Sequence, residues 1–398
     1  MTERTAATRT AAVAGPDTAF DAVTLTELRR RRSWKWARYP ADVLPAWVAE
    51  MDVPVAEPIR AVLRAAVDLG DLGYADIGEL PGAYAEFAGR RWGWAVDPEQ
   101  VALVPDLMVG VAEILRTSTS PGDPVVINPP VYPPFFDTLA EVGRSAVEVP
   151  LARDPSGWRL DLDALEAAFR AGARAYLLCS PHNPTGSVWP AADLARIAEL
   201  AARYRVLVLA DEIHAPLTLP GATHVPYLTV DGAAPNAVLL SSASKAWNLA
   251  GLKCAVAVTG SDRMRSALDR LPKEVPYRAG ILGVLAAVAA FRDGGAWLDA
   301  LLAHLDRNRR LLADLLTGSL PEIGYRAPQA SFLAWLDCTT LGLGDDPARA
   351  FRKHGRVALS RGLDFGRQGA GYARLNIGTS AELLAEAVRR MATAVRRG

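Results

Sequence analysis

Short apolar runs alternate with longer amphipathic segments through the middle of this chain. Strands that appear as unbroken apolar runs, separated by helices, indicate a mainly parallel sheet that is covered on both faces. Ligands bind such sheets at the carboxyl ends of the strands. We therefore predict an α/β fold with strands at residues 125–128, 175–180, 206–211, 237–240 and 254–259.

Amphipathic periodicity predicts helices between these strands, at residues 160–171 and 191–204. The longest apolar stretch, residues 279–291, is 13 residues long. A helix needs about 20 apolar residues to span a bilayer, so this stretch predicts a buried helix and we expect no membrane partner.

The two ends of the chain differ from the middle. Residues 20–58 are rich in Trp and Pro, and a Leu/Ala/Arg-rich helical pattern runs from Phe291 to Leu316. Strand-like runs at 331–336 and 373–377 and a last helix at 381–397 predict a smaller α+β domain built from both termini. The predicted divisions are a mobile tail at 1–19, the N-terminal part of the small domain at 20–58, a large domain at 59–292 and the C-terminal small domain at 293–398.

Composition is that of an ordinary globular protein. Half of the 398 residues are hydrophobic and 22% are charged, and at about 150 residues per domain the length indicates two or three domains. Lys plus Arg and Asp plus Glu both number 44, so the net charge is zero. A nucleic-acid binder normally carries a basic excess, so we expect no nucleic-acid partner.

Cysteine usage and the N-terminus indicate the compartment. An odd number of widely spaced cysteines predicts neither a disulfide framework nor a zinc cluster, and it fits a reducing compartment. The first 17 residues lack the apolar core of a secretory signal, and the five histidines show no metal-ligand spacing. We therefore expect a cytoplasmic protein without a metal. The cysteines are Cys179, Cys254 and Cys338.

Polar side chains follow three of the predicted strands. Pro-His-Asn-Pro-Thr-Gly (181–186) follows the second strand, Asp-Glu-Ile-His (211–214) ends the third, and Ser-Ser-Ala-Ser-Lys (241–245) follows the fourth. Each segment alone has an ordinary explanation as a turn, a helix cap or a solvated lysine. The chain holds only five lysines, and Lys245 is the one on a loop at the end of a predicted strand.

Taken together and in order, these segments resemble pyridoxal-phosphate enzymes of the aspartate-aminotransferase fold, the class I/II aminotransferase superfamily. The segment 33–52, which ends in Trp-Val-Ala-Glu-Met-Asp, is similar to the entry signature of its MalY/PatB-like cystathionine β-lyase branch. Residues 129–135, 181–189 and 211–214 are similar to the same branch. The resemblance runs from Trp34 to the last helix. It implies fold type I, with a seven-stranded, mainly parallel sheet, helices on both faces, and a smaller α+β domain.

The resemblance implies pyridoxal 5'-phosphate as the cofactor and roles for the residues around it. Lys245 would form the covalent link, because a partly desolvated amine loses proton affinity and becomes nucleophilic. Asp211 would pair with the protonated ring nitrogen, Asn183 would hydrogen-bond the phenolic oxygen, and Tyr132 would stack on the ring. His214 would either support Asp211 or be an ordinary buried histidine.

The same resemblance implies a phosphate site at the start of a helix. The backbone amides of Leu107 and Met108 would face the phosphate, with Ser242 and Lys253 supplying further contacts. Asp106 departs from the small residue that the family commonly has there. A carboxylate is acceptable at this position as a helix cap, provided that it points away from the phosphate.

Substrate and partner also follow from the resemblance. Tyr74 matches a tyrosine that reaches the phosphate of the neighbouring subunit, which implies a homodimer with shared active sites. Arg374 and Ala49 would bind the amino-acid substrate, and a planar guanidinium suits its carboxylate. The chain departs from the family after Asn376, where Ile-Gly-Thr-Ser replaces Gly-Cys-Pro-Arg, and at Pro216, which replaces an Asp. These departures leave the particular substrate open.

The lyase branch implies α,β-elimination from an S-substituted L-cysteine, with thiol, pyruvate and ammonia as products. A fold does not determine one reaction, so an aminotransferase that acts on an L-amino acid and a 2-keto acid is the alternative. A regulator that acts through protein contacts would not need Lys245 or the residues expected to surround the cofactor. This chain has all of them, which favours an enzyme. The substituent on sulfur and the pathway stay open.

Overall fold

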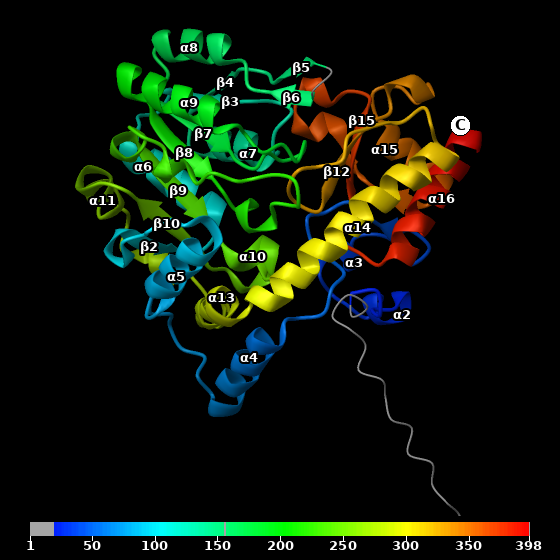
Figure 1. Ribbon diagram of the computed structural model, residues 1–398, viewed down its shortest axis with the longest axis horizontal. Coiled ribbons are helices and arrows are strands. Elements are labelled where there is room, and N and C mark those ends of the chain that lie inside the picture. The colour runs from blue at the N-terminus through cyan, green and yellow to red at the C-terminus, as the bar shows by residue number, and fades with distance from the viewer. Residues whose placement is uncertain (1–19, 155–156, 398) are drawn as a thin grey trace, which may run out of the picture.

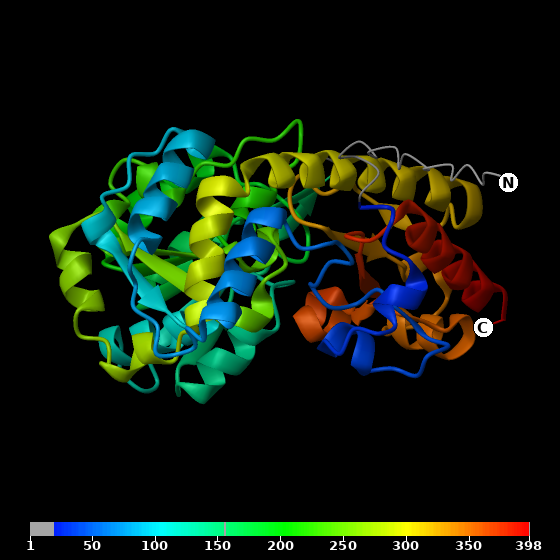
Figure 2. The same ribbon diagram turned by 90° about the horizontal axis from the view of Figure 1, so that it is seen from below.

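A seven-stranded sheet forms the centre of the larger of two lobes (Figure 2). The computed structural model describes residues 20–154 and 157–397, so the predicted tail at 1–19 lies outside it. In spatial order the strands are β2 (Val101–Val104), β10 (Ala255–Thr259), β9 (Ala237–Ser241), β8 (Leu207–Asp211), β7 (Ala175–Cys179), β3 (Pro124–Ile127) and β4 (Ser145–Glu148).

Strand directions confirm the mainly parallel arrangement. The five strands from β4 to β9 pair in parallel, whereas β10 is antiparallel to both β9 and β2. The register places Cys179 opposite Asp211, and Asp211 opposite Leu240, so β7, β8 and β9 end at one edge. The hydrophobic pattern did not predict β2 or β4. β4 is a mostly exposed edge strand and so lacks a continuous apolar run.

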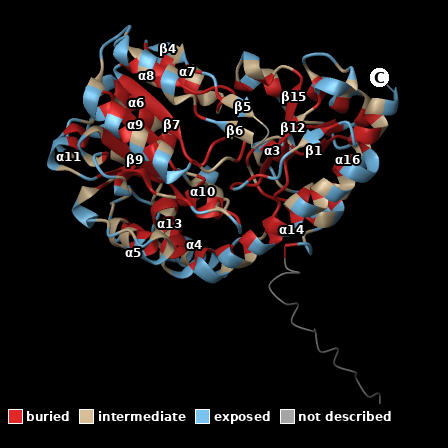
Figure 3. Cartoon of the chain, turned by 45° about the horizontal axis from the view of Figure 1, so that its top comes forward, coloured by how far each residue is buried: buried red, intermediate tan, exposed pale blue. Residues whose placement is uncertain are grey.

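Helices cover both faces of this sheet, as predicted, and the buried strands lie between them (Figure 3). Alternate residues of a strand face opposite layers. On β7, Leu177 belongs to one apolar cluster, and Tyr176 and Leu178 belong to the other. One layer contains α6 (Leu107–Ser118), α7 (Pro134–Glu141), α11 (Asp262–Leu268) and α12 (Glu274–Tyr277). The other contains α4 (Glu57–Leu69), α5 (Leu80–Trp92), α8 (Leu162–Arg170), α9 (Ala191–Tyr204), α10 (Ala243–Ala246) and α13 (Ile281–Asp293).

The smaller lobe is built from both ends of the chain, as its sequence predicts. β1 (Leu44–Pro45) pairs in parallel with β13 (Val357–Ala358), which joins the N-terminal segment to the C-terminal part. An antiparallel sheet consists of β11 (Gly324–Tyr325), β12 (Leu333–Asp337), β15 (Tyr372–Asn376) and β14 (Ser360–Arg361). This lobe also contains α2 (Leu25–Leu28), α3 (Trp34–Ala37), α15 (Pro347–Ala350) and α16 (Ala381–Arg397). A hairpin of β5 (Ala152–Asp154) and β6 (Gly157–Arg159), from the middle of the chain, contacts it through an ion pair between Arg153 and Asp337. The residue-level domain divisions stay a prediction.

The long helix α14 (Gly295–Ser319) runs from the larger lobe along the smaller one (Figure 1). It meets α13 at a bend of 80°. Much of α13 is buried, as predicted for the apolar stretch at 279–291. Within residues 20–154 and 157–397, no single helix is long and apolar enough to cross a membrane, although α13 and α14 taken together pass on length and composition.

Candidate active site

Polar groups from several elements meet at one edge of the large sheet. β7, β8 and β9 end at this edge, β10 begins there, and α6 starts just after the end of β2. The side chains at this edge line a cavity of about 330 Å³. Its lining includes Asp106, Leu107, Met108, Tyr132, Asn183, Asp211, His214, Ser242, Lys245 and Lys253.

Lys245 lies on the single helical turn α10. Its Nζ donates a hydrogen bond to the backbone oxygen of Ala49, at 3.1 Å. Burial and the positive charge of Arg374 lower the pKa of Lys245 to about 8, although the nearby Asp211 acts in the opposite direction. An amine with this pKa has a substantial neutral, nucleophilic fraction near neutral pH.

Asp211 is the buried last residue of β8. One carboxylate oxygen accepts a hydrogen bond from the backbone N–H of Ile213, at 3.1 Å. Burial raises the pKa of Asp211 to about 7. An additional nearby cation would favour the ionised carboxylate, and a protonated ring nitrogen is such a cation.

Tyr132 and His214 line the same cavity. Burial and the charge of Asp211 raise the pKa of Tyr132 to about 12, so its ring stays a neutral phenol. Burial and the neighbouring cations lower the pKa of His214 to about 3, so its imidazole is neutral. Among the described residues, its buried Nδ1 has no partner and the ring makes no hydrogen bond to Asp211. Support of Asp211 by His214 therefore stays a prediction.

The start of α6 has the features of an anion site. Asp106 caps this helix by accepting a hydrogen bond from the Val109 N–H, at 2.9 Å. Its other oxygen lies 3.0 Å from the Nζ of Lys253, which offsets the extra carboxylate. Leu107 and Met108 are the first two residues of the helix, where backbone N–H groups have no intrahelical acceptor. These amides together with Lys253 suit a phosphate dianion.

Ser242 is placed differently from the sequence expectation, although it lines the cavity. Its hydroxyl donates to the backbone oxygen of Cys254 at 2.6 Å and accepts from the Ser244 N–H at 3.0 Å. Donation to a phosphate would require the hydroxyl proton to leave Cys254. The phosphate-binding role of Ser242 stays a prediction.

Arg374 reaches the site from β15 of the smaller lobe. Its Nη1 donates to the Asn183 side-chain oxygen at 2.8 Å, and its Nη2 donates to the Trp47 backbone oxygen and the Ser360 hydroxyl, each at 3.2 Å. Its buried Nε has no partner in the described part of the chain. Burial lowers the pKa of Arg374 to about 10. A buried guanidinium with a spare donor is suited to a carboxylate ligand.

The Asn183 amide is oriented by Arg374. Because its oxygen accepts from the guanidinium, its NH₂ group remains to donate. This arrangement suits the predicted hydrogen bond to a phenolic oxygen of the cofactor.

A larger cleft of about 1000 Å³ adjoins the first cavity. Tyr132 and Lys245 line both spaces, and Ala49, Trp47 and Arg374 line only the larger one. The sequence-predicted substrate residues Ala49 and Arg374 therefore line the larger cleft. The predicted cofactor residues other than Tyr132 and Tyr74 line only the smaller cavity.

Tyr74 is far more exposed than the other predicted site residues. Its side chain is 85% exposed and contacts Tyr277 edge to face, with ring centroids 6.2 Å apart. In the described ranges it lines neither cavity. The chain thus does not bring Tyr74 to its own site.

The sequence reasoning gave no site role to several residues near the site: Lys35, Asp52 and Asn376, which are buried, and Asn248 and Ser360, which are half-buried. Only Asn376 carried a signal, since it follows Arg374 by two positions and so lies on the same face of a strand. The described residues contain no group of three or more side chains that could hold a metal ion. All three cysteines are free and buried.

Comparison with known proteins places the chain among related sequences. A family model for aminotransferase class I and II matches residues 39–391. A Mycobacterium tuberculosis protein with the provisional name cystathionine beta-lyase is 49% identical, over 94% of this chain and 97% of its own length. The cystathionine beta-lyase of Corynebacterium glutamicum is 35% identical, over 93% of this chain and 98% of its own length. The solved structure of a PLP-bound C-S lyase from Staphylococcus hominis matches with a TM-score of 0.87 and 25% sequence identity. The match covers 94% of this chain and 98% of the other.

Proposed function

The chain belongs to the aminotransferase class I and II family, and from that membership we propose that it is a pyridoxal-phosphate-dependent carbon–sulfur β-lyase. It cleaves an S-substituted L-cysteine by α,β-elimination to a thiol, pyruvate and ammonia. The observation that carries this function is the position of Lys245 at the junction of the two cavities. One amine there serves both the cofactor and the substrate.

The smaller cavity fits pyridoxal phosphate in its charges and donors. When bound, the cofactor supplies a carbonyl carbon for an amino group and an electron-withdrawing ring. We propose that Asp211 faces its ring nitrogen, Asn183 its phenolic oxygen and Tyr132 its ring. The amides at the start of α6 and the Lys253 ammonium hold its phosphate.

Different residues of this chain carry out different steps of the elimination. Arg374 binds the substrate carboxylate through its guanidinium, beside the backbone of Ala49. Lys245 takes the proton from the substrate Cα, for which a pKa of about 8 is well suited. The Cβ–S bond then breaks and its electron pair leaves on sulfur; a cysteine-like thiol has a pKa of about 8.5, so the thiolate leaves readily. Addition of water to the remaining three carbons releases pyruvate and ammonia.

An aminotransferase is the weaker alternative. The same residues would bind an amino acid and move its Cα proton, but a second keto acid must then accept the amino group. The near-full-length relatives that carry the cystathionine beta-lyase name favour elimination.

We predict that the purified enzyme releases thiol and pyruvate from S-substituted cysteines without any added keto acid. Elimination regenerates the cofactor in each cycle, so no acceptor is needed. The assay measures thiol, pyruvate and ammonia for a panel of cysteine S-conjugates, with and without 2-oxoglutarate. Turnover that strictly requires the keto acid contradicts the lyase and indicates an aminotransferase.

We also propose that the enzyme works as a homodimer with shared active sites. Large apolar side chains are exposed on and just after α4, a helix that projects from the larger lobe (Figure 1). A second copy of the chain is the partner that would cover them, since such patches on a soluble surface mark association sites. Two-fold symmetry makes any exchange of residues reciprocal. The exposed side chains on and just after α4 are Val67, Leu69, Leu72 and Tyr74, and the exposed Tyr277 of α12 packs against Tyr74.

Mixed dimers test whether Tyr74 acts across the interface. We predict that mixing Tyr74→Phe chains with Lys245→Ala chains restores about half of the wild-type activity per mixed dimer. Under sharing, one site carries both lesions and the other is intact, as two-fold reciprocity requires. If the mixed dimer shows only half the activity of the Tyr74→Phe homodimer, the tyrosine serves its own chain.

A further inference from the structure

The segment 47–52, which follows β1, connects the catalytic groups to a buried network. The backbone oxygens of Trp47 and Ala49 accept hydrogen bonds from Arg374 and Lys245. The oxygens of the alternate residues, Val48 and Glu50, both accept from the Asn376 side chain, at 2.7 and 2.6 Å. Successive carbonyl groups therefore face the active site and the interior in turn.

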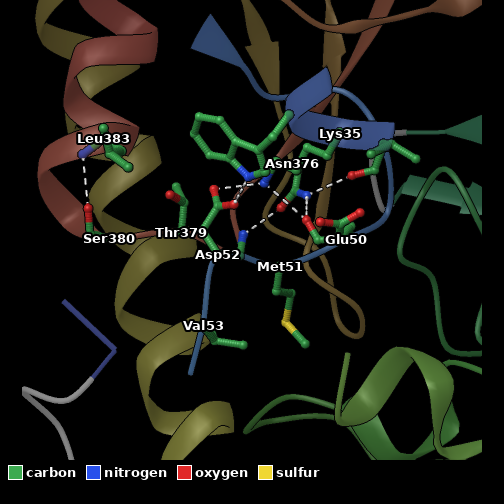
Figure 4. Close-up of polar contacts among 12 residues, drawn as sticks. Lys35, Glu50, Met51, Asp52, Val53, Asn376, Thr379, Ser380 and Leu383 are labelled. Atoms are coloured by element: carbon green, nitrogen blue, oxygen red, sulfur yellow. Dashed lines mark hydrogen bonds and ion pairs between the residues drawn. The ribbon is translucent and has the colours of Figure 1, made fainter. Parts of the chain in front are cut away.

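A buried ion pair holds the interior side of this segment (Figure 4). The Nζ of Lys35 donates to the Glu50 backbone oxygen at 3.0 Å and to the Asp52 carboxylate at 2.7 Å. The second carboxylate oxygen of Asp52 accepts from the indole N–H of Trp36, at 2.9 Å. Lys35 is 1% exposed and Asp52 is 3% exposed. Both charges are thus fully paired inside the protein.

The segment is also tied to the turn that carries the catalytic lysine. Asn248, three residues after Lys245, exchanges two hydrogen bonds with the backbone of Met51, at 2.8 and 2.9 Å. Asn248 adopts a left-handed backbone conformation with φ of 60°, which few residues other than Gly, Asn and Asp adopt readily. The segment thus joins the lysine turn of the larger lobe to β15 of the smaller one.

A stability role alone accounts poorly for this network. Desolvating two charges costs so much that well-packed apolar side chains of similar volume are often equally stabilising. What an apolar pair cannot do is donate to the Glu50 backbone oxygen. The donors of Lys35 and Asn376 converge on this one oxygen, one residue beyond the carbonyl that receives Lys245.

We propose that Lys35, Asp52 and Asn376 are positioning residues that hold the Ala49 carbonyl as the acceptor for the free amine of Lys245 and the Trp47 carbonyl beside Arg374. Whenever the Lys245 amine is not covalently bound, this carbonyl directs it to the junction of the two cavities. The kinetic consequence rests on the proposed function, because it concerns removal of the Cα proton by Lys245.

A matched pair of variants separates positioning from stability. Asn376 and Asn308 are both 1% exposed, and each donates two hydrogen bonds to backbone oxygens. Asn308 binds the oxygens of Ile377 and Thr379, at 2.8 and 2.7 Å, and makes no hydrogen bond to segment 47–52 in the part of the chain that the structure describes. Asn376→Ala and Asn308→Ala each remove two such bonds and one more, which the Asn376 oxygen accepts from the Gly378 N–H and which Asn308 makes with the His304 ring. We therefore expect similar losses in Tm.

The first measurement uses the cofactor-free protein. Limiting acetic anhydride is applied across a range of pH, and mass spectrometry measures the labelling of each lysine. A hydrogen bond from the Lys245 ammonium to Ala49 favours the charged form, so its loss should lower the pKa of Lys245 by about one unit in Asn376→Ala. In Asn308→Ala we expect the pKa of Lys245 to equal that of the wild-type protein.

The second measurement is kinetic. We expect kcat for thiol release to fall by about 10-fold to 100-fold in Asn376→Ala, the cost of a misplaced reacting group, and to stay near wild type in Asn308→Ala. If Asn376→Ala does not fold, the double variant Lys35→Met with Asp52→Asn replaces it. That variant removes the Lys35 donor to the Glu50 oxygen without leaving an unpaired buried charge, and we expect a shift of the Lys245 pKa in the same direction.

Two results overturn the proposal. One is an unchanged Lys245 pKa and kcat in the folded Asn376→Ala or double variant, and the other is an equal change in Asn308→Ala. Failure of the proposed function is distinct, because wild-type enzyme would then release no thiol. The labelling comparison needs no turnover and tests the positioning in either case.

Discussion

Replacing Lys245 by alanine is expected to lower the rate of thiol release by about 10⁴-fold, the upper end of what a general base contributes. Lys245 lines both cavities, and the proposed function gives it a task in each. In that proposal it bonds the cofactor and takes the Cα proton, so its loss should impair both steps. No other lysine among the described residues lines the larger cleft, and Lys253 is held by Asp106 at 3.0 Å.

The same variant tests the covalent link directly. We expect the purified wild-type protein to be yellow, and borohydride to fix the cofactor to a peptide that contains Lys245. The exposed Lys273 provides the control, and Lys273→Ala should keep colour, linkage and turnover. A reducible link at another lysine in Lys245→Ala would show that the assignment is wrong.

Replacing Arg374 by alanine is expected to lower kcat/KM for the amino-acid substrate by about 30-fold to 1,000-fold, mainly through KM. A charge-assisted, bidentate contact to a carboxylate contributes about 2–4 kcal/mol, and about 1.4 kcal/mol corresponds to a factor of ten. The affinity for the cofactor should stay near normal. Among the described residues, Asn183 is the only one lining the smaller cavity that accepts a hydrogen bond from Arg374, and the Asn183 NH₂ group that we propose faces the cofactor is retained.

Two further variants sharpen this test. Arg374→Lys keeps the charge but lacks the planar fork, so it should recover only part of the loss. Arg361→Ala is the control, because Arg361 also lines the larger cleft but is paired with Asp346 at 2.8 Å. Steady-state kinetics and a cofactor titration measure the two effects separately. Unchanged kinetics in Arg374→Ala would mean that the substrate carboxylate is held elsewhere.

Part of this site could be predicted because the order of strands imposes it. Asp211 ends an apolar strand, Asn183 and Lys245 follow two others, and parallel strands end at one edge of their sheet. Their convergence in one cavity therefore needed only the hydrophobic pattern. The family resemblance added the residues of the smaller lobe, such as Arg374 and Ala49, which no local pattern connects to that edge.

Burial of charge could not be predicted in the same way. Lys35 lies between two tryptophans in the sequence, and its position alone did not distinguish it from a surface lysine. In the fold it is almost fully buried against Asp52, because β1 pairs with β13 and brings the N-terminal segment onto β15. The pairing of β1 with β13 and the bond from Asn376 to Glu50 join residues more than 300 positions apart, and such contacts leave no periodic signal in the sequence.

The sequence by itself determined the central strands of the larger lobe, the parallel layered arrangement and three of the residues at the edge of the sheet, because buried strands and amphipathic helices are local patterns. Only the tertiary structure decided how the second lobe closes the site. The segment 47–52 meets Arg374 and Lys245 there through backbone oxygens. Every residue carries such an oxygen whatever its side chain, so its direction depends on packing between distant segments and not on residue type.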